Sequence, residues 1–211
     1  MLKSPTSMSN ILLFGGTFDP FHNGHYKMLD IALKTLSLEK VIIMPNFVPV
    51  NKKQPKFSAT QRYEMLKASQ YDFPNYKGSN VEYEISNFEM NQKQRCYSID
   101  TINYLYRKFK NKELYLLIGS DNFFSFHLWK DYEKILDLVT LFVVNRRNDL
   151  NHDYSHYIEE KLDRKYYKSI MISQNKPINI SSTKIREKLS NKLFLSNNVP
   201  TFIMSKLETI I

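Results

Sequence analysis

The sequence predicts an α/β fold, with a doubly wound, mostly parallel sheet and a small helical part at its C-terminal end. Short apolar runs alternate with segments whose apolar residues recur at helical spacing. No internal repeat, low-complexity tract or long linker interrupts this alternation. A glycine-rich segment follows the first apolar run, where parallel sheets commonly bind ligands. We expect one domain over 1–211, with an α/β core over about 10–145 and a helical segment over 178–211.

The expected strands are short apolar runs rich in β-branched residues and bounded by Gly, Pro or charged side chains. They lie at 10–14, 40–45, 81–85, 113–119 and 141–144. The first run leads into the glycines, and the second stops at Pro45. Strands of this kind, separated by helices, are typical of a parallel sheet that is covered on both faces.

The expected helices each carry an apolar stripe or open with a capping residue. They lie at 24–36, 59–70, 97–109, 129–139, 181–189 and 199–210. Ser58 is the expected cap of the second helix. In the fourth, Trp129, Tyr132 and Ile135 begin the apolar stripe. The polar stretch 148–167 receives no assignment.

Composition limits the function classes. The net charge of +9 favours anionic partners, either nucleic acids or phosphorylated small molecules, although it also fits a surface of solvated charges. Cys96 is the only cysteine, so no intrachain disulfide forms and a reducing cytoplasm is expected. The N-terminus has no apolar core of a secretory signal, and no apolar run reaches the length of a membrane span. We therefore expect no membrane partner.

The segment GGTFDPFHNGH at 15–25 holds three of the five glycines and two histidines. Its leading glycines follow a buried strand, where missing side chains let a ligand approach the backbone. The next helix should begin near Gly24, and its free N–H groups favour a phosphate. His22 and His25 lie at the same end, can donate hydrogen bonds to phosphate oxygens and can carry charge near pH 7. The segment is therefore interpreted as a phosphate site.

Other interpretations of this segment stay open. Glycine-rich tight turns also form without any ligand. The two histidines are possible metal ligands, but structural zinc needs about four ligands and the chain has a single thiol. The pattern matches neither the Rossmann glycine fingerprint nor a Walker loop.

Two signatures carry a resemblance to a known superfamily. GTFDPFHNGH resembles the H-x-G-H signature of the nucleotidyltransferases, and ISSTKIR at 180–186 resembles their second signature, ISSTxIR. The segments PNFVPVNKK, QRYEML, CYSIDTI and GSDNFFSFHLW follow in the order seen in bacterial nicotinate-nucleotide adenylyltransferases. The resemblance covers residues of about 10 to 208, and phosphopantetheine adenylyltransferases resemble the chain less. It implies a Rossmann-like nucleotidyltransferase fold.

The resemblance implies a reaction in NAD biosynthesis. Nicotinate mononucleotide and ATP would give nicotinate adenine dinucleotide and pyrophosphate. The nucleophile is a phosphate monoester, which is largely dianionic at neutral pH because its second pKa is about 6. No general base is required, and Mg²⁺ is expected to arrive on the ATP phosphates with no metal fixed by the protein.

The resemblance also implies which residues form the site. The catalytic residues would be His22, His25, Lys52 and Arg186. The ATP contacts would be Gly15, Gly16, Thr17, Phe18, His22, Gly24, His25, Gly119, Asp121, Ile180, Ser181, Ser182, Thr183 and Arg186. The contacts to nicotinate mononucleotide would be Gly16, Lys52, Tyr97, Ser98, Trp129 and Arg146.

Several of these residues also have plain structural interpretations. Trp129 alone would be interpreted as a core residue, Asp121 as a helix cap, and Lys52 as a solvated surface charge. The chain also departs from the family pattern. Asn51 stands where the family often has a phosphate-binding histidine, and Ser98 stands in place of the usual Thr. Cys96 replaces the usual Ser, and 147–149 replaces the family's R-P-G.

Two other functions remain as alternatives. The first is an adenylyltransferase for nicotinamide mononucleotide or another phosphomonoester, because the choice of acid over amide depends on a single group. The second is a basic nucleic-acid-binding module, which predicts clustered basic and aromatic residues. The basic residues are instead spread along the chain, so we expect no nucleic-acid partner. The sequence does not predict an oligomeric state.

Overall fold

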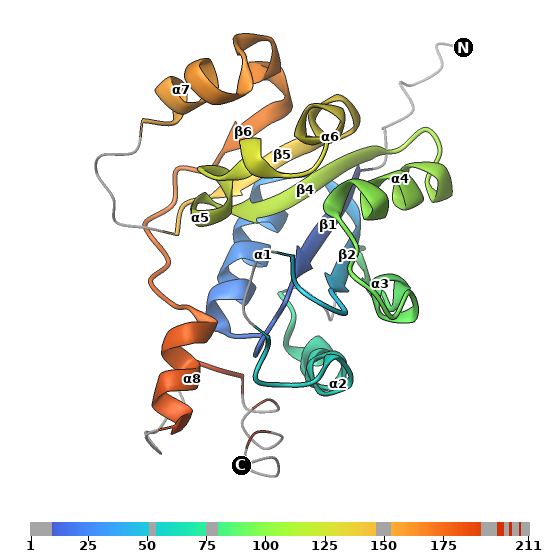
Figure 1. Ribbon diagram of the computed structural model, residues 1–211, viewed down its shortest axis with the longest axis vertical. Helices are drawn as coiled ribbons and strands as arrows, with labels where there is room; N and C mark the ends of the chain where they lie inside the picture. The colour runs from blue at the N-terminus through green and yellow to red at the C-terminus, as the bar shows by residue number, and fades with distance from the viewer. Residues whose placement is uncertain are drawn as a thin grey trace.

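The computed structural model describes residues 10–50, 54–74, 80–146, 153–190 and 198–200, together with Ile203 and Leu207. Its centre is a six-stranded parallel sheet with the order β3-β2-β1-β4-β5-β6 (Figure 1). The strands are β1 (Asn10–Gly16), β2 (Leu38–Pro45), β3 (Glu82–Ile85), β4 (Glu113–Gly119), β5 (Thr140–Val144) and β6 (Ile170–Ile172). The predicted α/β class with a parallel sheet is confirmed.

The helices of the described ranges connect these strands. They are α1 (Asn23–Thr35), α2 (Ala59–Ser69), α3 (Phe88–Asn91), α4 (Ser98–Lys108), α5 (Ser120–Phe123), α6 (Tyr132–Leu138), α7 (Tyr154–Tyr157) and α8 (Ser182–Ser190). Shorter helical turns are η1 (Gln70–Asp72), η2 (Phe126–Leu128), η3 (Ile158–Leu162) and η4 (Arg164–Ser169). Ser58 caps α2 as predicted, because its hydroxyl accepts the Gln61 N–H at 3.2 Å.

Alternation along β1 divides the core between the two faces of the sheet. Leu12 and Phe14 pack with residues of α1, α2 and α8 on one face. Ile11 and Leu13 pack with residues of α4, α5, α6 and α7 on the other face. All four side chains are buried, so both faces of the sheet are covered, as a doubly wound fold requires.

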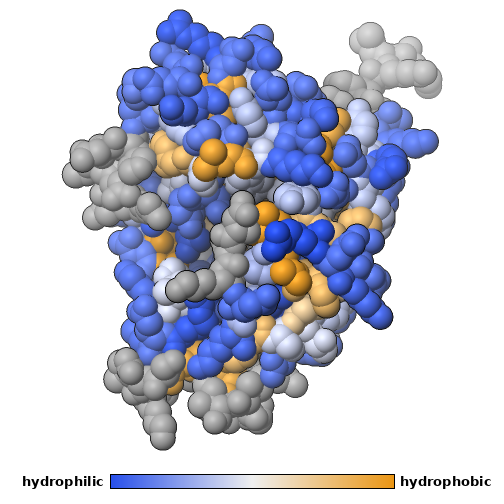
Figure 2. Space-filling view, in the orientation of Figure 1, coloured by the Kyte–Doolittle hydropathy of each residue, from blue (hydrophilic) through white to orange (hydrophobic). Residues whose placement is uncertain are grey.

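The face of the molecule in Figure 2 is mostly polar. Hydrophilic residues cover most of it, and hydrophobic residues gather in several groups between them. None of the helices within the described ranges has the length and apolar character that crossing a bilayer demands.

The predicted helix 129–139 begins later than expected. Asp131 has φ 53° and ψ 39°, a left-handed conformation that interrupts the chain between Trp129 and Tyr132. Trp129 itself is extended and ends η2. The apolar stripe continues across this break, which is why periodicity alone placed the start of the helix at Trp129.

Other differences concern polar segments. The stretch left without assignment contains α7, η3 and the first part of η4, which leads into β6 at the edge of the sheet. Most of the expected helix 199–210 lies outside the described residues. The division into one domain with a C-terminal helical segment stays a prediction.

The direction in which strands are added to the sheet reverses between β1 and β4. The chain moves outward from β1 to β2 and β3, and then crosses back to β4 on the other side of β1. Loops at the carboxyl ends of β1 and β4 therefore diverge and leave room for a ligand between them. The glycine-rich segment leaves β1 at this point.

Candidate active site

The glycine-rich turn joins β1 to α1. A Cβ atom on Gly15 would meet no atom within 4 Å, so a ligand can reach the backbone here. A Cβ atom on Gly16 would lie 2.8 Å from the ring of Phe18, which is buried in the turn. Asn46 Nδ2 donates to Thr17 Oγ1 at 3.1 Å and thereby ties the turn to the residue that follows β2. The turn is thus compact on its inner side and open at Gly15.

His22 and His25 stack at the start of α1. Their ring centroids lie 3.7 Å apart, and the backbone N–H of His22 donates to His25 Nδ1 at 3.1 Å. This bond assigns the proton of a neutral His25 ring to Nε2. Both side chains are buried.

The His22 ring is buried without a hydrogen-bond partner for either of its nitrogens among the described residues. Burial, followed by the positive charge of Arg146, lowers the pKa of His22 to about 3. The expectation that His22 carries charge near pH 7 is therefore wrong for the unliganded protein. A buried polar atom without a partner costs roughly 1–3 kcal/mol, and a ligand that supplies the missing bond removes that cost.

The second signature segment lies directly against the first. A Cβ atom on Gly24 would lie 3.0 Å from the His22 ring and 3.2 Å from Ile180 Cβ, so any larger residue would crowd both neighbours. The Asn23 N–H at the beginning of α1 donates to Asn198 O at 2.9 Å. The two signatures, far apart in sequence, are therefore adjacent around His22.

The start of α8 lies beside the turn that precedes α1 (Figure 1), and side-chain bonds connect the two. Ser182 Oγ donates to Pro20 O at 3.1 Å. Arg186 donates to Asp19 O at 2.7 Å, lies 3.2 Å from the Asp19 carboxylate, and also donates to Thr183 Oγ1 at 3.1 Å. These bonds fix the N-terminal end of α8 beside that of α1, so both helix dipoles favour an anion in the same region.

The carboxyl end of β4 completes this side of the site. A Cβ atom on Gly119 would collide with Asp121 Oδ1 and lie 2.5 Å from Arg146 Cδ. Arg146 donates to Ile180 O at 2.6 Å, and its guanidinium lies 3.5 Å from the Asp121 carboxylate. Arg146 Nε and Asp121 Oδ1 are buried without partners among the described residues. Like His22, they have bonding capacity that the described part of the chain leaves unused.

Arg62 holds the surrounding loops and was not identified from the sequence. Its side chain is 1% exposed and donates to Thr17 O at 2.6 Å, Asn46 O at 2.8 Å and Phe47 O at 3.0 Å. A fourth bond runs from Nε to Phe57 O at 3.3 Å. One guanidinium thus joins the turn after β1 to the segment between β2 and α2. Carbonyl partners leave no pattern in a sequence, so no signal could have revealed this role.

A second group of predicted residues lies at the start of α4. Tyr97 precedes this helix, Ser98 is its first residue, and Lys130 Nζ lies 4.6 Å from the centroid of the Tyr97 ring. Trp129 is half-buried, and its ring centroid lies 5.0 Å from that of Phe126. The core interpretation of Trp129 is thus true in part, because the residue packs on Phe126 but remains partly exposed.

A buried carboxyl group lies beneath the first turns of α4. Glu89 is 7% exposed, and Thr101 Oγ1 donates to its Oε1 at 2.6 Å. Burial raises the pKa of Glu89 to about 7, and the nearby charge of Asp100 adds to the effect. Glu89 sits in a polar stretch that the sequence analysis did not single out.

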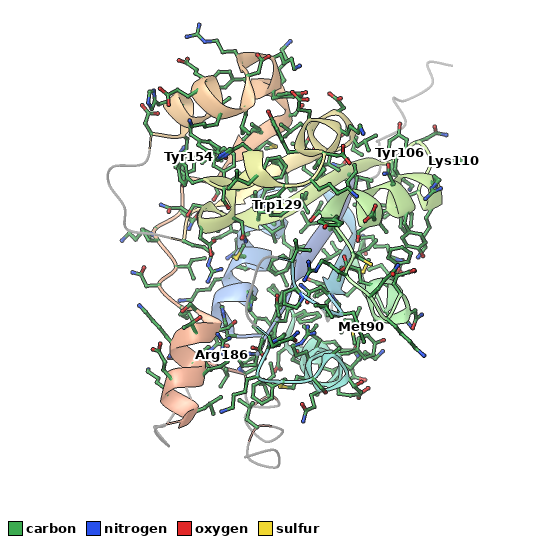
Figure 3. All side chains as sticks on the ribbon, in the orientation of Figure 1. Met90, Tyr106, Lys110, Trp129, Tyr154 and Arg186 are labelled. Carbon is green, nitrogen blue, oxygen red and sulfur yellow. The ribbon has the colours of Figure 1, made fainter. Side chains whose placement is uncertain are left out.

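The structure therefore brings most predicted residues into two groups. His22, Gly24, Ile180, Ser182, Arg186 and Arg146 surround the adjoining ends of α1 and α8, while Tyr97, Ser98 and Trp129 lie near the start of α4. Arg186 and Trp129 lie in different parts of the view in Figure 3. Lys52 and Asn51 fall outside the described residues, as does 147–149.

Within the described ranges, no three His, Cys, Asp or Glu side chains gather closely enough to hold a metal ion. The Asp19 carboxylate accepts the backbone N–H groups of Lys56 and Phe57, each at 2.9 Å, besides facing Arg186. Its oxygens are therefore committed to the fold.

Comparisons with known proteins agree with this geometry. A family model described as cytidylyltransferase-like matches residues 13–188, which defines the class of this chain as a nucleotidyltransferase. The chain is 36% identical over 199 residues to a Clostridium botulinum protein named "Probable nicotinate-nucleotide adenylyltransferase", covering 93% of this chain and 94% of the relative. A protein of the same name from Methylacidiphilum infernorum is 32% identical, with 99% and 93% covered. The chain belongs to the nicotinate-nucleotide adenylyltransferase family, which confirms the resemblance inferred from its motifs.

A solved structure shares the fold. Plasmodium falciparum nicotinic acid mononucleotide adenylyltransferase, in complex with NaAD, superimposes with a TM-score of 0.73 over 96% of each chain at 17% sequence identity. At this identity the likeness concerns the fold alone.

Proposed function

We propose that the protein transfers the adenylyl group of ATP to nicotinate mononucleotide and forms nicotinate adenine dinucleotide and pyrophosphate, a step of NAD biosynthesis. The observation that carries the proposal is the junction of α1 and α8 around His22. Two helix N-termini meet there, beside a buried imidazole whose nitrogens have no partner among the described residues. Such a site suits the polyphosphate of ATP.

The chemistry requires positioning and charge stabilisation. A phosphate oxygen of the mononucleotide attacks the α-phosphorus of ATP, one P–O bond forms, and the bond to pyrophosphate breaks. The nucleophile is already dianionic at neutral pH, so no side chain has to remove a proton. This agrees with a site built from histidines, arginines and backbone N–H groups.

His22 and His25 would contact the reacting phosphates. A neutral His22 can donate one hydrogen bond to a phosphate oxygen, and the polyphosphate would raise its pKa by offsetting burial with opposite charge. The proton on His25 Nε2 would point away from the bond that Nδ1 makes to the His22 backbone. Arg186 and Lys52 would add positive charge along the leaving group.

The other ATP contacts would come from the two signature segments and the β4 end. The β- and γ-phosphates would lie at the start of α8, near Ser181, Ser182 and Thr183. Asp121 would bind ribose hydroxyls, since its Oδ1 has no partner within the described ranges. The remaining contacts are the backbone and neighbours of the turn: Gly15, Gly16, Thr17, Phe18, Gly24, Gly119 and Ile180.

The pyridine end would lie at the start of α4. The first N–H groups of α4 and the Ser98 hydroxyl can receive the nicotinate carboxylate, and the partly exposed Trp129 can stack on the pyridine ring. Tyr97 would line the same end. Gly16, Lys52 and Arg146 would contact the phosphate of the mononucleotide between the two ends.

Mg²⁺ would be held by the phosphates of ATP, because the Asp19 oxygens are committed to backbone N–H groups and to Arg186. When bound, the ion neutralises charge on the transferred and leaving phosphates. The proposal also places the enzyme in the cytoplasm, on the ground of its single cysteine.

The test is pyrophosphate release from ATP and Mg²⁺, with nicotinate mononucleotide and nicotinamide mononucleotide assayed side by side. Release with the acid alone is the expected result. Pyrophosphate release with nicotinamide mononucleotide alone would change the assigned substrate, while adenylyl transfer would remain the assigned reaction. Release with neither would overturn the proposed function.

A further inference from the structure

The segment 120–131, which joins β4 to α6, is covered by α7. The ring centroid of Tyr157 lies 5.0 Å from that of Phe123 and 5.2 Å from that of Phe124. Tyr154 adds a contact at 5.0 Å to Phe124. The previously unassigned stretch therefore packs against the segment that carries both Asp121 and Trp129.

The hydroxyl group of Tyr157 is bonded to this segment. It accepts the backbone N–H of His127 at 3.2 Å and lies 2.8 Å from His127 Nδ1. Tyr157 is 9% exposed, so both bonds form largely away from water. The Tyr157 hydroxyl thus fixes the backbone and the side chain of one residue in η2.

Trp129 ends this same turn. Its backbone N–H donates to Phe126 O at 2.9 Å, and its ring packs on the fully buried ring of Phe126. His127 lies between Phe126 and Trp129 in the turn. A displacement of His127 therefore moves the backbone that sets the direction of the Trp129 ring.

The other tyrosine of α7 reaches the opposite end of the segment. Tyr154 interacts through a hydrogen bond with the Ser120 side chain, whose oxygen also accepts the Arg146 N–H at 3.0 Å. Tyr154 and Trp129 are labelled in Figure 3, where they lie on the same half of the molecule, near β4 and α5. Contacts from α7 therefore bracket the segment, with the Tyr157 hydroxyl nearest to Trp129.

We propose that Tyr157 is a positioning residue for the mononucleotide end of the site, where its hydroxyl holds η2 so that Trp129 faces the pyridine ring. This inference rests on the proposed function, which assigns Trp129 to that ring. Tyr157 acts through His127 and does not touch the substrate. The stretch 148–167, which received no assignment from the sequence, thus contributes to substrate binding through Tyr157.

The variant Tyr157→Phe removes the hydroxyl and keeps the ring. Tyr167→Phe is the control, because the Tyr167 hydroxyl donates to Ser155 O at 3.2 Å and to Glu159 Oε1 at 3.4 Å, both outside 120–131. Trp129 is the only tryptophan, so intrinsic tryptophan fluorescence reports on it alone. We expect acrylamide to quench the unliganded Tyr157→Phe protein more strongly than the wild type or the control.

Steady-state kinetics gives the functional half of the test. Tyr157→Phe should raise the KM for nicotinate mononucleotide by about tenfold, as loss of the hydroxyl's two hydrogen bonds to His127 allows, while kcat and the KM for ATP change by less than about twofold. Tyr167→Phe should change none of these values. If Tyr157→Phe does not fold, His127→Ala removes the Nδ1 contact from the other side and should give the same split between the two KM values.

Three outcomes distinguish a positioning role of Tyr157 from its absence and from a failure of the proposed function. Stronger quenching together with the KM split supports the inference. Equal quenching in Tyr157→Phe and Tyr167→Phe, or an equal rise of both KM values, overturns it. Absence of pyrophosphate release in the wild type refutes the proposed function instead, and the fluorescence of the unliganded protein still shows whether Tyr157 positions Trp129.

Discussion

His22 at the start of α1 and Glu89 beneath α4 are two buried titratable side chains, 1% and 7% exposed, at opposite ends of the proposed site. Burial shifts the pKa of each toward its neutral form, that of His22 down to about 3 and that of Glu89 up to about 7. The same physical cause therefore acts on both. Their surroundings nevertheless differ, and the difference separates the proposed ligand contact, His22, from Glu89.

Glu89 has a partner within the protein, because the Thr101 hydroxyl donates to it at 2.6 Å. His22 has none for either ring nitrogen among the described residues. Glu89 already has a hydrogen-bond partner within the fold, whereas the His22 nitrogens keep bonding capacity that a ligand could use. Burial and a shifted pKa alone would not distinguish His22 from Glu89 as candidates for a functional site.

The largest expected effect concerns the histidines. His22→Ala and His25→Ala should each lower kcat by a factor of about 10²–10³, because each removes a preorganised contact to charge that develops in the transition state. Circular dichroism should show an intact fold. Glu89→Gln is the contrasting variant and should keep kcat/KM within about threefold. Near-normal turnover in the histidine variants would contradict the assignment of these side chains to the reacting phosphates.

A smaller effect concerns the dependence of stability on pH. The folded pKa of Glu89, about 7, exceeds the ordinary glutamate pKa of 4.5, so the folded state binds the extra proton. Wild-type stability should therefore fall as pH rises from 4.5 through 7, by up to about 3 kcal/mol. Glu89→Gln keeps an acceptor for Thr101 and lacks the carboxylate, so it should unfold at higher urea concentration than the wild type at pH 8 but not at pH 5.

Equal urea midpoints of the wild type and Glu89→Gln at both pH values would contradict this. Glu64→Gln is a suitable control, because Glu64 is an exposed glutamate on α2. Its substitution should leave the pH profile of the wild type unchanged.

Trp129→Ala tests the division between the phosphate end and the pyridine end. The KM for nicotinate mononucleotide should rise by about tenfold, since stacking of a base on an aromatic ring contributes about 1–3 kcal/mol. The KM for ATP should change by less than about twofold. Equal changes of both KM values would show that Trp129 does not belong to one end of the site.

The smallest expected signal is proton uptake when pyrophosphate binds. His22 is neutral at pH 6 in the unliganded protein, and an adjacent polyanion should raise its pKa toward or above that pH. Calorimetric titration at pH 6 in two buffers of different ionisation enthalpy should reveal uptake of a fraction of one proton. His22→Gln should lower that uptake. Equal proton uptake by the wild type and His22→Gln would show that a group other than His22 binds the proton.

The fold was predictable because it depends on local patterns. Apolar runs and helical stripes gave the five longer strands and most helices, and the Ser58 cap was visible in the sequence. The errors occurred where a local pattern continues across a break in the backbone, as at Asp131, where a segment is polar, as for α7, or where an apolar run is very short, as for β6. Spacing cannot reveal a single left-handed residue.

The sequence by itself determined the two signature segments, the family and the predicted substrate contacts, since these reside in short stretches of neighbouring residues. Only the tertiary structure decided which of them meet and in what state. Gly24 admits Ile180 beside His22, packing removes the charge of His22, and Arg62 and Tyr157 act through bonds to distant backbone groups. Burial and the identity of a partner arise when segments far apart in the chain pack together, so no local pattern encodes them.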